Sequence, residues 1–164
     1  MEQGKLDIAI VSDKRESNNI TYHKLFSDEL MVIVPLKHPL AKLSYISPDH
    51  FRNETAIIYT IIDEESTLLN KILKLAGVYP KKVLRIELTE AIIEMVKAGI
   101  GISMLARWAI EPHILKKELV ALPIGRYGYK RNWFAATLKH SQPEYIKGFI
   151  NMLGLDKTLL KQNK

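Results

Sequence analysis

The residues with the clearest chemical potential stand at the start of a predicted helix, just after Leu88. Thr89 carries a hydroxyl there, and Glu90 follows it with a carboxylate. A helix N-terminus offers unpaired N–H groups and a positive dipole, so it favours a bound anion. Thr89 is equally consistent with a structural N-cap, because its hydroxyl can accept a hydrogen bond from the first turn.

A strand, a helix and a second strand are predicted to position these residues. The helix carries a buried stripe at helical spacing, made of Ile92, Ile93, Met95 and Val96. Gly99 is predicted to end the helix, because glycine enters the left-handed backbone region freely. Ile100 to Leu105 then continues as a buried strand. Such a βαβ unit builds parallel sheets, whose ligand crevices lie at the strand ends.

The rest of the chain alternates in the same way, which predicts an α/β fold. Apolar and β-branched runs predict strands at Leu6 to Val11, Glu29 to Val34, Thr55 to Tyr59, Val83 to Leu88, Leu119 to Ile124 and Trp133 to Leu138. Helices are predicted at Ser47 to Phe51, Thr67 to Ala76, Ala109 to Lys117 (broken or started late by Pro112) and Pro143 to Leu153. The inward stripe of that last helix is expected to hold Tyr145, Ile146, Phe149, Ile150 and Leu153.

Composition limits the class of protein. A chain of 164 residues with 47% hydrophobic content can bury a core. The net charge of +6 comes from scattered lysines and arginines, which is typical of solvated faces. The absence of cysteine excludes disulfides and thiol chemistry. No signal segment and no 18-residue apolar run is present, so we expect a cytoplasmic protein without membrane contact.

The histidines give no sign of a metal or catalytic site. The five of them are widely spaced, and no two stand at i and i+4 beside a carboxylate: His23, His38, His50, His113 and His140. No nucleophile motif surrounds the serines. We therefore expect no catalytic residue, no metal and no cofactor, and an enzyme on this architecture is the less favoured alternative.

Three motifs, taken together, resemble one family over essentially the whole chain. The first is Gly4-Lys5-Leu6-Asp7-Ile8-Ala9-Ile10, a "G-x-L-D-x-x-I" strand. The second is the run from Phe26 to Pro35, followed by His38-Pro39-Leu40-Ala41. The third is Ala98-Gly99-Ile100-Gly101-Ile102. These motifs resemble the effector-binding domain of LysR-type transcriptional regulators.

Within that family, the segments at 88–91 and 105–109 look most like the branch that regulates methionine biosynthesis. The resemblance implies a two-lobed fold like type II periplasmic binding proteins, with two crossing strands between the lobes. It implies a partial lobe I at 4–34 and 131–155, incomplete at its N-terminus, a lobe II at 35–130, and a tail at 156–164. It also implies DNA contact only through a helix-turn-helix domain absent from this chain, in a parent that is a homodimer or tetramer.

The resemblance implies a sensor and no catalyst. A small metabolite would bind between the lobes and favour one arrangement of them. The methionine-biosynthesis branch would make homocysteine that effector. The expected contacts lie at strand ends: Ser12, Tyr59, Thr60, Thr89, Glu90, Ala106, Arg107 and Trp108.

Individual roles follow from the side chains. Thr89 would meet a carboxylate and Glu90 an amino group. Arg107 would pair with an anion, although a surface arginine is equally consistent. Trp108 and Tyr59 would supply apolar contact, and each is also consistent with a core aromatic. At Ala106 many family members carry proline, which alters the local shape of the cleft.

Two further readings remain open from the sequence. A transport solute-binding protein shares the fold, but it would be exported, and the "H-P-L-A" turn is a feature of regulators. A nucleic-acid-binding module is suggested by the charge of +6. Salt-dependent DNA binding by this chain alone would support that last alternative.

Overall fold

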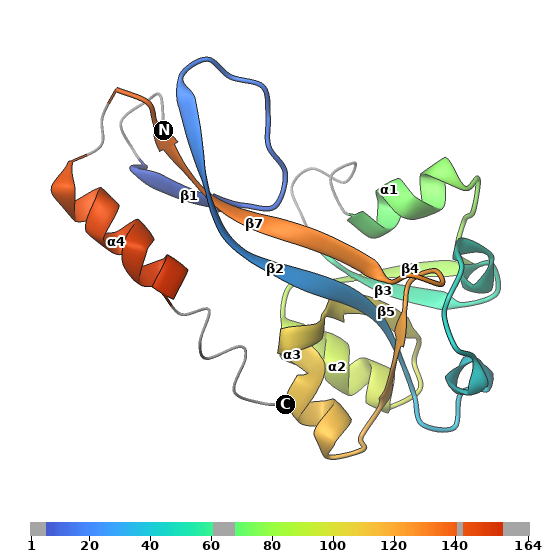
Figure 1. Ribbon diagram of the computed structural model, residues 1–164. Helices are drawn as coiled ribbons and strands as arrows, with labels where there is room; N and C mark the ends of the chain where they lie inside the picture. Colours follow the sequence, from blue (N-terminus) through green and yellow to red (C-terminus); the bar gives the residue numbers. More distant parts are fainter. Residues whose placement is uncertain (1–5, 61–67, 141–142, 156–164) are drawn as a thin grey trace. The chain divides into compact units, whose positions relative to one another are not determined.

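A computed structural model of the chain describes residues 6–60, 68–140 and 143–155 (Figure 1). It divides into two compact units. Unit 1 holds the residues up to Asp28 together with those from Lys130 onward, and unit 2 is Glu29–Tyr129. Two strands, β2 (Ile20–Val34) and β7 (Tyr129–Leu138), contribute residues to both units.

Unit 1 is built on antiparallel strands. Strand β1 (Ile8–Val11) pairs with β7, with Ile8 opposite Thr137. On its other side β7 neighbours β2. The side chain of His23 on β2 reaches across to the buried Thr137, with 3.1 Å between Nε2 and Oγ1. Helix α4 (Glu144–Leu155) completes the described part of the unit.

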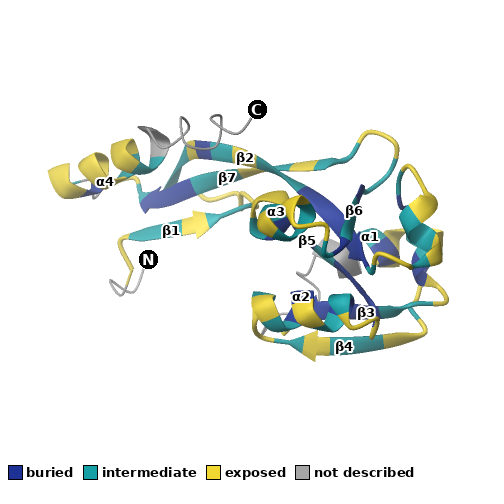
Figure 2. Ribbon diagram, turned by 90° about the horizontal axis from the view of Figure 1, so that it is seen from below, coloured by how far each residue is buried: buried dark blue, intermediate teal, exposed yellow. Residues whose placement is uncertain are grey.

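The inward face predicted for α4 is only partly right. Ile146 is buried at 2% exposure, but Tyr145 and Phe149 are exposed, as the mostly exposed α4 in Figure 2 illustrates. The helix carries apolar side chains on more than one face, so helical spacing alone does not identify the stripe that is buried. The predicted tail at 156–164 lies outside the described residues.

Strand β2 is much longer than predicted. The sequence suggested a strand at Glu29 to Val34, where the residues are apolar and β-branched. In the structure it begins at Ile20, because the polar half of the strand has β7 beside it in unit 1. Pairing therefore extends the strand through residues whose own composition favours a loop.

Unit 2 centres on β3 (Thr55–Tyr59), which lies where the sequence predicts it. Strand β3 pairs in parallel with both β4 (Lys82–Ile86) and β5 (Ile102–Ala106). Strand β2 pairs antiparallel with β5 and also with β6 (Val120–Pro123). Helix α2 (Thr89–Lys97) connects β4 to β5, which confirms the predicted βαβ unit.

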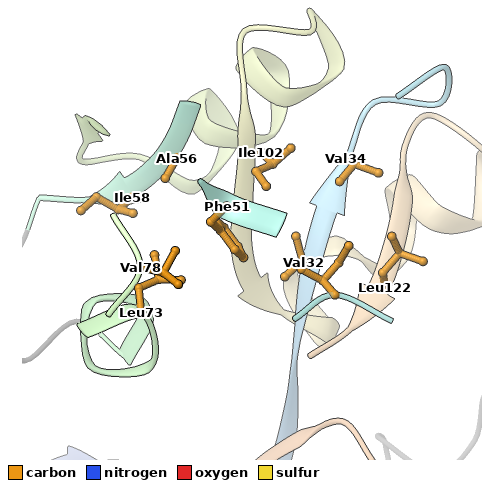
Figure 3. Close-up of a cluster of buried hydrophobic side chains, with 10 residues drawn as sticks. Val32, Val34, Phe51, Ala56, Ile58, Leu73, Val78, Ile102 and Leu122 are labelled. Atoms are coloured by element: carbon orange, nitrogen blue, oxygen red, sulfur yellow. The ribbon is translucent and has the colours of Figure 1, made fainter. Parts of the chain in front are cut away.

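The core of unit 2 lies on both faces of this sheet. Val32 and Val34 point into one cluster, which includes Phe51 and Leu73 (Figure 3). The alternate residue Ile33 packs in the second cluster, against residues of α2 and of α3 (Arg107–Leu115). Because successive side chains of a strand alternate between faces, a sheet covered on both faces needs continuous apolar runs. The run at 30–34 has that character.

Several helix boundaries differ from the prediction. Leu88 is the N-cap residue of α2 and Thr89 is its first helical residue, so Thr89 is not the cap. Gly99 does follow the helix end with a φ of +77°, which confirms its predicted role. Helix α3 begins directly after β5 and continues through Pro112. Proline has no backbone N–H, so the helix lacks one i to i−4 hydrogen bond at this position.

The remaining helices are short. Helix α1 is Leu68–Leu75, and the predicted start at Thr67 lies outside the described residues. A 3₁₀ helix at Pro48–Phe51 has Ser47 as N-cap and His50 in a capping box, close to the prediction. Another 3₁₀ turn covers Pro39–Lys42. No described helix combines the length and apolar character that crossing a membrane requires.

Candidate functional site at the carboxyl edge of unit 2

The carboxyl ends of the parallel strands β3, β4 and β5 meet at one edge of unit 2. Tyr59 at the end of β3 stands opposite Ile86 at the end of β4. Strand β5 runs parallel to β3 with Ile57 opposite Ser103. In this register the last residue of β5, Ala106, lies at the same edge as Tyr59 and Ile86. Helices α2 and α3 begin just past these strand ends. We call this set of strand and helix ends the carboxyl edge.

A side-chain hydrogen bond crosses the carboxyl edge. The hydroxyls of Tyr59 and Thr89 are bonded to each other, which ties the end of β3 to the first residue of α2. The backbone N–H of Thr60 donates to the carbonyl of Ile86 at 3.0 Å. The ring of Tyr59 also packs against the second core cluster. The ring of Tyr59 is therefore part of the core, while its hydroxyl belongs to the candidate site.

The first turns of two helices point their dipoles at this edge. The N-cap residues are Leu88 for α2 and Ala106 for α3, and neither forms a side-chain cap hydrogen bond. Uncapped N–H groups at a helix start are available to an anion. Glu90 lies in the first turn of α2 and is exposed, so the same edge also presents a carboxylate.

The end of β5 supplies the remaining predicted residues. Ala106 is buried and pairs with Leu30 of β2. Arg107 is exposed, and its Nη1 lies 3.7 Å from Oε2 of Glu29. Trp108 is 55% exposed, so it is not a core aromatic. An indole ring with this exposure presents an apolar surface to solvent.

Ser12 belongs to the other unit. It follows β1 in unit 1, where it is half-buried. The other predicted contacts, Tyr59 through Trp108, all belong to unit 2. The structure thus brings together the unit 2 residues, and the participation of Ser12 stays a prediction.

Glu29 is a site residue that the sequence analysis missed. Besides its approach to Arg107, its carboxylate lies so close to Gly128 that a Cβ at that position would stand 2.4 Å from Oε1. Glu29 is the first residue of unit 2 on β2. Its only sequence signal was its place in the family-like run from Phe26 to Pro35, which identifies no contact.

The two shifted pKa values in the described part of unit 2 belong to Glu118 and Lys97, which are not residues of the carboxyl edge. The pKa of Glu118 lies below its ordinary value because His113 donates a hydrogen bond to it, and Lys97 donates a second. Lys97 in turn has a raised pKa, through its hydrogen bonds to Glu94 and Glu118. Within the described ranges, no group of three or more His, Asp or Glu side chains is arranged to hold a metal ion.

Comparison with known proteins identifies the family. The model of the LysR substrate binding domain matches residues 1–155. The HTH-type transcriptional regulator MetR of Haemophilus influenzae is 31% identical over 146 residues, covering 88% of this chain and 47% of the relative. The Escherichia coli K12 regulator of the same name is 27% identical over 150 residues, covering 92% and 47%. The chain thus spans about half the length of these curated relatives.

Solved structures agree with this assignment. The regulatory domain of NMB2055 (MetR), a LysR family regulator from N. meningitidis, superposes with a TM-score of 0.88 at 30% identity, covering 96% of this chain and 73% of that one. The Synechocystis PCC6803 CcmR regulatory domain in complex with 2-PG gives a TM-score of 0.80 at 25% identity, covering 99% and 77%. This likeness confirms the predicted periplasmic-binding-protein-like α/β fold. The chain belongs to the LysR substrate-binding domain family, the effector-binding regulatory domains of LysR-type transcriptional regulators.

Proposed function

We propose that the carboxyl edge of unit 2 is the lobe II half of the effector site, and that the effector is homocysteine. The observation that carries the proposal is the tie between Tyr59 and Thr89. It fixes a polar strand end against a helix start whose N–H groups have no side-chain cap. Preorganised donors of this kind bind an anion without a further ordering cost.

The side chains around this tie match an amino acid with a short apolar arm. A carboxylate fits the first turn of α2, where Thr89 adds a hydroxyl. The carboxylate of Glu90 pairs with an ammonium group, and Trp108 offers an apolar surface. The likeness to MetR regulators directs this chemistry to homocysteine among such amino acids.

The wider function follows from the family. We propose that units 1 and 2 are the counterparts of lobes I and II, with Ser12 contributing from unit 1. Effector binding would favour one arrangement of the lobes and so alter a dimer or tetramer on DNA. In that account the parent protein contacts DNA through a helix-turn-helix domain in the cytoplasm, and the domain described here catalyses no reaction.

Isothermal titration calorimetry of this chain with homocysteine tests the proposal. We expect saturable binding, weakened at least about tenfold in the Glu90→Gln variant because it loses a charge-assisted contact. Lys116→Ala is the matched control, since this exposed lysine lies at the other end of α3. It should bind like the unchanged chain.

Two outcomes would contradict the proposal. If the folded chain gives no heat with homocysteine but binds 2-PG, the ligand of the CcmR regulatory domain, the proposed effector is wrong while the site survives. If Glu90→Gln binds homocysteine with unchanged affinity, the amino group of the ligand is held elsewhere and the assigned role of Glu90 is wrong.

A further inference from the structure

Unit 2 has a cavity at the edge of its sheet opposite to the carboxyl edge. It has a volume of about 530 Å³ and is lined by His38, residues 53–55, Lys81 and Lys82, and residues 99–101. Apart from His38, which follows the end of β2, these residues lie at or just before the amino ends of β3, β4 and β5. We call it the amino-edge cavity. Its volume lies within the range of small-molecule pockets, roughly 300–1,000 Å³.

Two lysines, Lys81 and Lys82, belong to the lining of this cavity. Lys81 and Lys82 are both exposed, and the described part of the chain gives neither of them an ion-pair partner. Glu54 is the carboxylate in the lining, and its Oε2 lies 3.4 Å from Nε2 of His38. The lining therefore holds two lysines and one glutamate, and the carboxylate of that glutamate already has a neighbour.

The ring of His38 has a neighbour at each of its two nitrogens. Its Nδ1 accepts a hydrogen bond from the backbone N–H of Leu40, at 3.3 Å. Its Nε2 lies on the side of Glu54, so this carboxylate already has a neighbouring side chain within the lining. The lining thus contains two lysines and a single glutamate.

The floor of the cavity is rigid backbone. A Cβ on Gly101 would stand 2.3 Å from the carbonyl oxygen of Thr55, so only glycine allows β5 to approach β3 this closely. Ile100 beside it is 47% exposed and offers an apolar surface within the cavity. The amide of Asn53 supplies a further hydrogen-bonding group.

From this lining we infer that the amino-edge cavity binds a small organic anion bearing a carboxylate or phosphate group. Lys81 and Lys82 would hold the anionic group, because an ammonium and an oxyanion form charge-assisted hydrogen bonds. Asn53 would add a polar contact, and Ile100 would cover the hydrocarbon part. The site is separate from the carboxyl edge and does not depend on the identity of the effector.

Two-dimensional ¹⁵N–¹H NMR of the full chain, titrated with inorganic phosphate and in parallel with succinate, tests this inference. We expect saturable shifts of the amides of Thr55, Gly99 and Gly101 with at least one of the two probes, and none at Thr89. The responding probe identifies the anionic group. Sodium chloride at equal ionic strength should not reproduce these shifts.

Variants decide whether the lysines carry the binding. The double variant Lys81→Ala/Lys82→Ala should weaken binding at least about tenfold, because it removes both ammonium partners. Lys116→Ala, another exposed lysine, should leave the affinity unchanged. Shifts that grow linearly with salt, or that survive the double variant at full affinity, would overturn the inference. So would saturable shifts confined to Thr89 and its neighbours.

Discussion

A single hydroxyl contact joins the two elements that bear most of the candidate site. Replacing Tyr59 by Phe removes its hydroxyl and leaves Thr89 without this partner. We expect Tyr59→Phe to lower the free energy of unfolding by about 1 kcal/mol, the usual net value of such a bond. Urea unfolding measures this. The Tyr59→Phe and Thr89→Val changes should also be non-additive, and strictly additive losses would show that the two side chains act independently.

A buried ion pair is expected to contribute to the stability of unit 1. The side chain of Asp28 is only 4% exposed, and Arg131 binds its carboxylate through both Nε and Nη2, at 2.8 and 2.7 Å. The guanidinium also stacks 4.5 Å from the ring of Trp133. Arg131→Ala would remove the guanidinium that binds this buried carboxylate in two places, so we expect a loss of about 3–5 kcal/mol in urea unfolding.

The exposed pair of Lys147 and Glu144 is the matched control in the same unit. Lys147→Ala should cost less than about 0.5 kcal/mol, because solvent screens such pairs. Equal losses in the two variants would mean that burial does not set the value of the Asp28–Arg131 pair.

Some individual residues of the candidate site were predictable from the sequence. Tyr59, Thr89 and Trp108 end strands or begin helices, and those positions can be read from apolar periodicity. Glu29 was not recognised, because its partner Arg107 is distant in the sequence. The same is true of the Asp28–Arg131 pair in unit 1, which lies outside the candidate site. A contact between positions more than 70 residues apart leaves no local pattern, and only the fold reveals it.

Among the elements, the packing of β5 against β3 depends on one glycine. The Gly101→Ala change would place its Cβ against the backbone carbonyl of Thr55, so β3 and β5 must separate. We expect a loss of about 1–3 kcal/mol, typical of overpacking in a buried position. Gly148→Ala on α4 meets nothing within 4 Å and should stabilise the chain by about 0.5–1 kcal/mol. Thermal unfolding of both variants checks this, and a neutral Gly101→Ala would contradict the close approach.

The ion cluster between α2 and the end of α3 predicts a pH dependence. The hydrogen bond from His113, then that from Lys97, hold the pKa of Glu118 below its ordinary value of 4.5. A carboxyl with a lowered folded-state pKa stabilises the fold above its unfolded value, and this stabilisation disappears as the pH falls. Glu118→Gln should therefore be less stable at pH 7, with a difference that shrinks below pH 4.5.

Urea unfolding at several pH values measures this difference. Glu144→Gln on the exposed face of α4 serves as control, and its stability should follow that of the unchanged chain at every pH. A Glu118→Gln deficit that persists undiminished in acid would show that packing, and not charge, accounts for it.

Elements with strong local patterns were predicted well. Strand β3 and the βαβ unit lie in the structure as the sequence indicates, since their apolar runs and glycine agree with the packing. The polar half of β2 and the start of α3 were not predicted. The polar half of β2 is extended because β7 lies beside it. Helix α3 starts early because β5 leads into it without an intervening loop. Tertiary context overrides propensity at both places.

At the scale of the whole molecule, the chain crosses between its units on β2 and β7. The family resemblance leads to two lobes connected in this way, and the likeness to LysR regulatory domains supports that fold. The lobe limits at 4–34, 35–130 and 131–155 stay a prediction. A sensor of this type needs a ligand that distinguishes between conformations, so affinity for the effector is the property on which the account rests.

Thermal unfolding of the chain at increasing homocysteine concentration tests that property most directly. A ligand that binds only the folded state raises stability with the logarithm of its concentration, by about 2.7 kcal/mol at a hundredfold excess over the dissociation constant. For a domain of this size we expect the midpoint to rise by about 5–10 °C. A cooperative transition whose midpoint stays constant up to millimolar homocysteine would contradict the account.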